Sequence, residues 1–73
     1  MNRVPEIIET LKEVAEKTDN IWSMYALGNI YSSEMYNCKD IELAIKWYKL
    51  AEKDGSEYVS YKLGKIYLDE QSQ

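Results

Sequence analysis

The sequence predicts an all-helical fold, a short α-solenoid of four antiparallel helices, from three observations. The heptapeptide YALGNIY (residues 25–31) returns as YKLGKIY (residues 61–67), an offset of 36 residues measured from Gly28 to Gly64. A period of this length is typical of repeat arrays. Apolar residues follow helical spacing, and the alternation of period two that marks strands is absent. The polar connectors are short enough to join antiparallel neighbours.

Two helices are expected in the first half of the chain. The first covers about residues 5–17, with Pro5 at a position where its missing N–H costs no hydrogen bond. Asp19 or Asn20 can cap the second helix, which is expected over about residues 21–33. The stripe that we expect this second helix to bury consists of Ile21, Met24, Leu27, Gly28 and Tyr31.

Glycine within a helix is unfavourable by about 1 kcal/mol relative to alanine. Gly28 and Gly64 nevertheless occupy the same position of the repeated heptapeptide. This recurrence predicts that close approach of a neighbouring helix offsets the unfavourable propensity at both glycines.

Two further helices are expected in the second half. Asp40 is the predicted N-cap of the third helix, and Gly55 can take the left-handed conformation that ends it. Ser56 is then the predicted cap of a fourth helix, over about residues 57–70.

The repeat also predicts where the core lies. We expect Trp47 at its centre, between the two Leu-Gly helices, and Tyr67 in a buried position of the repeat, whereas Leu68 has no inward role. The chain is expected to form one helical-repeat domain over residues 1–73, with a repeat core over about residues 21–69.

The motif residues stand in a fixed order. They are Ala26, Leu27, Gly28 and Tyr31, then Asp40, Ala44, Trp47, Tyr48, Ala51 and Gly55, then Tyr61, Leu63, Gly64 and Tyr67. This ordered set resembles the Sel-one-like repeat, a relative of the tetratricopeptide repeat, over roughly residues 21–67. The family's loop between the paired helices usually carries two glycines, but Glu34 and Tyr36 occupy those positions here. A different loop backbone is therefore expected, in an array shorter than the usual three or more units.

The resemblance implies a non-catalytic module that binds proteins and scaffolds their complexes. It also implies that the Leu-Gly helices line a concave face, where the residues pointing toward a partner are Trp22, Tyr25, Asn29, Ser33, Tyr58, Tyr61, Lys65 and Asp69. One interpretation is an aromatic-rich groove for a partner peptide or helix, because Trp and Tyr are frequent hot spots of binding. The alternative is that most of these rings fill the seams between helices, as aromatic stripes at helical spacing commonly do.

Composition removes most catalytic chemistry from consideration. The chain has no histidine and a single cysteine, Cys38, so His-based triads, His metal sites and cysteine clusters are excluded. The three glycines form no phosphate-binding loop. We therefore expect no enzymatic activity and no cofactor. With 9 Lys and Arg against 13 Asp and Glu, the net charge of −4 argues against nucleic acid and anionic membranes as partners.

The remaining expectations concern location and assembly. A lone cysteine, no apolar N-terminal segment and no long apolar run favour a cytoplasmic location. Apolar surface at both ends of a short array favours a homodimer or a tightly held protein partner. Two alternatives to an interaction module stay open. One is a small acidic inhibitor that blocks a larger target, including at a nucleic-acid-binding surface, and the other is a repeat fragment or a design used as a scaffold.

Overall fold

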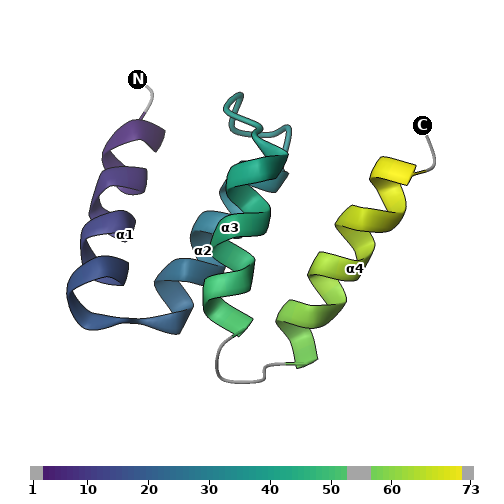
Figure 1. Cartoon of the computed structure of the whole chain (residues 1–73). Coiled ribbons are helices and arrows are strands. Elements are labelled where there is room, and N and C mark those ends of the chain that lie inside the picture. The colour runs from purple at the N-terminus through teal and green to yellow at the C-terminus, as the bar shows by residue number, and fades with distance from the viewer. Residues whose placement is uncertain (1–2, 53–56, 72–73) are drawn as a thin grey trace.

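The computed structural model describes residues 3–52 and 57–71, with side chains up to residue 69. Within these segments it contains four helices and no strand. The helices are α1 (Val4–Thr18), α2 (Ile21–Ser32), α3 (Ile41–Ala51) and α4 (Glu57–Gln71). Consecutive helices run in opposite directions, and each packs mainly against its neighbours in the chain (Figure 1). The all-α fold class predicted from the sequence is confirmed.

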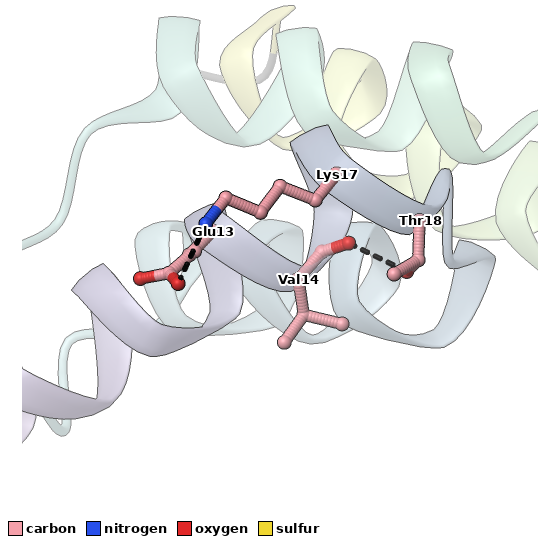
Figure 2. A network of polar contacts seen from close by, with 4 residues as sticks. All are labelled: Glu13, Val14, Lys17 and Thr18. Carbon is pink, nitrogen blue, oxygen red and sulfur yellow. Dashed lines mark hydrogen bonds and ion pairs between the residues drawn. The ribbon is translucent and has the colours of Figure 1, made fainter.

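Local hydrogen bonds end α1 and turn the chain toward α2. Lys17 Nζ lies 3.1 Å from Glu13 Oε1, and Thr18 Oγ1 donates to the Val14 carbonyl at 2.6 Å (Figure 2). Asp19 then adopts the left-handed region, with φ 55°, and its N–H donates to the Ala15 carbonyl at 3.0 Å. Because the ion pair is exposed, it adds little stability. The left-handed residue is what stops the helix.

Side-chain caps start the next two helices. Asn20 Oδ1 accepts from the Ser23 N–H at 3.0 Å, and Asp40 Oδ1 accepts from the Leu43 N–H at 3.2 Å. Each bond satisfies a backbone donor that has no partner within its own helix. The predicted caps at Asn20 and Asp40 are confirmed, and those predicted at Gly55 and Ser56 lie outside the described residues.

The loop between α2 and α3 contains one left-handed residue. This residue is Asn37, with φ 58°, and it is not at either position where the Sel-one-like family usually has glycine. Asparagine tolerates this region better than most residues. The Asp40 N–H donates to the Tyr31 carbonyl at 2.8 Å, which ties the end of the loop to α2. The loop therefore turns without glycine.

All four helices contribute to one apolar core. Tyr48 and Leu27 are its largest fully buried side chains. Trp47 is also buried, as predicted, with 4% of its surface exposed. The buried apolar residues are Ile8, Ala15, Met24, Leu27, Tyr31, Ala44, Trp47, Tyr48, Ala51, Val59, Leu63 and Ile66.

Two predictions drawn from the repeat are wrong for α4. Gly28 lies at a close crossing with α3, but apart from the backbone of its own helix and its chain neighbours, no described residue has a heavy atom within 4 Å of a Cβ built on Gly64. Tyr67 is 43% exposed, whereas its repeat partner Tyr31 is 7% exposed. The reason is position in the array: α2 packs between α1 and α3, whereas α4 stands at the edge and packs against α3 (Figure 1).

Candidate protein-binding groove

An apolar groove of about 490 Å³ opens between one end of α2 and the start of α4. Its lining residues are Ile21, Trp22, Tyr25, Tyr58 and Val59, and we call this site the α2–α4 groove. Trp22 is 78% exposed and Tyr58 is 59% exposed. Val59 is buried in the core. The groove thus has a base anchored in the core and two exposed aromatic walls.

Tyr25 is held in place by the two rings on either side of it. Its ring centroid lies 5.2 Å from that of Tyr58 in an edge-to-face arrangement and 5.8 Å from that of Tyr48. Both separations are favourable for aromatic pairs. The pKa of Tyr25 is raised to about 12. The largest cause is burial, and the second is a hydrogen bond with the Tyr58 side chain. The phenol is therefore neutral at physiological pH, and Tyr25 adds no charge to the groove lining.

Polar side chains in α2 and directly after it form hydrogen bonds within the fold. The Tyr48 hydroxyl donates to Asn29 Oδ1 and lies 3.4 Å from Ser32 Oγ, and burial raises the Tyr48 pKa. Ser33 Oγ accepts from the Met35 N–H at 3.0 Å and shapes the start of the loop after α2. Both Asn29 and Ser33 were predicted to face a partner. In the structure each is partly buried and uses its side chain internally.

The predicted residues of α4 do not all reach one site. Tyr61 is 61% exposed and lies outside the α2–α4 groove. Lys65 and Asp69 instead line a smaller hollow of about 190 Å³, which also includes Ser32 and Tyr48. Of the eight residues predicted, Trp22, Tyr25 and Tyr58 come together in the groove.

Two lining residues were missed by the prediction. Ile21 was assigned to the buried stripe of its helix, and Val59 occupies the repeat position of the polar Ser23. Each directly adjoins an exposed aromatic, Trp22 or Tyr58, in the sequence. Trp22 and Tyr58 are 36 residues apart and so occupy the same repeat position. The apolar residue beside each of these two aromatics is the sequence signal that could have identified Ile21 and Val59.

The Tyr48 hydroxyl provides a test of this polar network. Tyr48→Phe should lower the free energy of unfolding by about 1–2 kcal/mol, because it removes the hydroxyl and leaves the Asn29 carboxamide without that bond. Urea unfolding at neutral pH measures the change. Tyr36→Phe is a control in the exposed loop and should have no effect beyond about 0.5 kcal/mol. Equal effects of the two substitutions would contradict the network.

The apolar lining of the groove can bury an apolar side chain. Among residues 3–52 and 57–71, no group of three or more His, Cys, Asp or Glu is placed to hold a metal ion. Of the helices in the described part, none has the length and apolar character needed to cross a membrane. Comparison of the chain with models of protein families, with curated proteins and with solved structures finds no match.

Proposed function

We propose that this chain is a non-catalytic protein-interaction module of the Sel-one-like repeat type, which binds a segment of a partner protein in the α2–α4 groove. The main support for this proposal is the exposure of Trp22, which lines an apolar groove and has 78% of its surface exposed. A large aromatic is unfavourable in water, and Trp is the residue most enriched at binding hot spots. Tyr58, also exposed, faces the same space and adds a second anchor.

The shape and charge of the groove define the ligand class. A single aliphatic or aromatic side chain of the partner would pack between Trp22 and Tyr58, above Tyr25. Glu57 is exposed next to Tyr58, and the whole chain carries a net charge of −4. Charge complementarity therefore favours basic residues flanking the partner's apolar anchor.

The outer face of α1 argues for this function over an acidic inhibitor. A mimic of nucleic acid needs a continuous acidic stripe. The charged residues that meet on this face are Glu9, Lys12, Glu13, Glu16 and Lys17, so the two lysines interrupt the acidic residues. Lys17 is paired with Glu13.

Peptide selection followed by mutation tests the groove. A displayed library of random peptides is selected against the full chain, and the affinities of the recovered peptides are then measured by titration. Trp22→Ala should weaken their binding by about 30-fold or more, since hot-spot truncations cost 2 kcal/mol or more.

The matched control is Thr10→Ala, an exposed position on α1 away from the groove. It should leave the affinity unchanged, and Trp22→Ala should melt like the parent chain. Selected peptides that lack an apolar anchor, or that bind the Trp22→Ala chain as tightly as the parent, would refute the proposed site.

A further inference from the structure

The interface between α2 and α3 is built around one tyrosine. Tyr48 of α3 packs over Gly28 so closely that a Cβ at this glycine would lie 2.5 Å from the Tyr48 ring. The Tyr25 ring lies beside it, and Asn29 and Ser32 contact its hydroxyl. These four α2 residues, Tyr25, Gly28, Asn29 and Ser32, form what we call the α2 cradle. The α2 cradle shows which positions of a Leu-Gly helix contact the helix that packs on it, here α3.

The 36-residue offset places an equivalent set on α4. Its members are Tyr61, Gly64, Lys65 and Leu68, which we call the α4 cradle. All four are exposed, with Tyr61 at 61% and Leu68 at 67%. Apart from the backbone of α4 and its chain neighbours, Gly64 has no heavy atom of the described residues within 4 Å of its Cβ position. The second cradle therefore has the glycine that admits a close helix, but no helix of the described chain packs on it.

We propose that the α4 cradle binds an amphipathic helix of a partner protein, seated on α4 as α3 is seated on α2. The α2–α3 interface supplies the geometry, because the same repeat positions recur at the exposed edge of the array. In α3, Ala44 and Ala51 are fully buried on either side of Tyr48 along the helix. Small residues at the same spacing from a central large side chain are thus expected in the partner helix.

The differences between the cradles define the chemistry of the partner. Leu68 stands where Ser32 contacts the Tyr48 hydroxyl, and Lys65 stands where Asn29 accepts its proton. The α4 cradle thus loses the acceptors for a hydroxyl and gains an apolar contact and a cation. It fits a phenylalanine or leucine in place of tyrosine, with a carboxylate on the partner helix near Lys65.

A second copy of this chain fits the α4 cradle poorly. By the repeat, α1 is the helix equivalent to α3, and Lys12 occupies the position of Tyr48. Stacking α1 of another copy on α4 would therefore bring Lys12 toward Lys65. Two α4 helices paired about Gly64 would bring both Lys65 side chains together. Like charges across an interface suppress such pairings, so a different protein is the better occupant.

The probe for this site is a helical peptide based on α3. An acetylated and amidated peptide with the sequence of residues 40–52 and the change Tyr48→Phe is titrated into the isotope-labelled full chain. We expect saturable binding, with the largest amide shifts at Tyr61, Gly64 and Leu68. The same peptide with alanine at the phenylalanine position should lose binding.

Gly64→Leu separates binding from folding. Because the space at Gly64 is open, this variant should melt at or above the melting temperature of the parent while its leucine fills the cradle. Affinity for the peptide should fall by about tenfold or more, as expected when a packed interface is overfilled. Trp22→Ala should leave this affinity unchanged, so failure of the α2–α4 groove and failure of the α4 cradle are distinguishable.

Any one of four results of the peptide titrations would overturn the proposal. They are the absence of saturable binding up to millimolar peptide, shifts centred on the α2 cradle, equal affinity of the Gly64→Leu variant, and loss of binding in Trp22→Ala with retention in Gly64→Leu. Self-association of the full chain that Gly64→Leu abolishes would also overturn it, because that result assigns the cradle to a second copy.

Discussion

Gly28→Leu should lower the free energy of unfolding by about 2 kcal/mol or more. A Cβ alone at this position would lie 2.5 Å from the Tyr48 ring, and leucine adds three further carbon atoms. Tyr48 cannot move aside easily, because it is fully buried and its hydroxyl is bonded to Asn29. The helices α2 and α3 would have to separate. Urea and thermal unfolding followed by circular dichroism measure the loss.

Gly64→Leu is the matched control for this prediction. It is the same substitution at the same repeat position, but the space around Gly64 is open in the described structure. This variant should be neutral, or more stable by up to about 1 kcal/mol, because leucine favours the helix over glycine. A similar loss of stability in both variants would show that a neighbouring segment covers α4, and a neutral Gly28→Leu would place α3 differently on α2.

The contrast between the two glycines shows what a repeat in the sequence can predict. The period indicates that both positions can accept a close helix, because most of the residues around the two glycines are the same in the repeated heptapeptide. Whether a helix is present at each position depends on the place of the unit in the array. Gly28 lies beside α3, whereas Gly64 lies at the edge. The same argument explains why Tyr31 is buried and Tyr67 is not.

The helices themselves were predictable because their signals are local. Asn20 and Asp40 bond to backbone donors three residues ahead, and those bonds need no tertiary contact. The loop between α2 and α3 was harder to predict. Its left-handed residue is Asn37, whereas the family pattern drew attention to the positions of Glu34 and Tyr36. Asparagine and glycine both suit this conformation, and sequence alone does not choose between neighbouring positions.

The candidate site was only partly predictable for a different reason. Helical register indicates the direction of Trp22, Tyr25 and Tyr58, and the structure brings these three together. Helical register does not indicate whether a long side chain of a neighbouring helix reaches the polar groups of this helix. Tyr48 extends from α3 and bonds to Asn29, so a residue predicted to face a partner supports the fold instead. Long side chains from another helix decide which polar groups of a groove stay available.

The two tryptophans of the chain should respond oppositely to truncation. Trp47→Ala should cost about 3–5 kcal/mol, because Trp47 is 4% exposed and its removal leaves a cavity between α3 and its neighbours. Trp22 is 78% exposed, so Trp22→Ala should change stability by no more than about 0.5 kcal/mol. Total stability for a small domain starts at about 5 kcal/mol, so the Trp47→Ala chain is expected to retain about 2 kcal/mol or less and to be partly unfolded at 37 °C.

A third variant distinguishes lost packing from lost polarity. The Trp47 Nε1 is buried and has no hydrogen-bond partner among the described residues. Trp47→Phe removes this unpartnered donor but keeps most of the apolar ring, so it should cost clearly less than Trp47→Ala. The Trp22→Ala chain retains only Trp47, so its fluorescence reports burial at that position directly. A solvent-exposed emission spectrum from this variant, or cooperative unfolding of Trp47→Ala at parental stability, would move Trp47 out of the core. Because Trp47 and Tyr48 are adjacent on α3, such a result would also contradict the packing of Tyr48 on the α2 cradle.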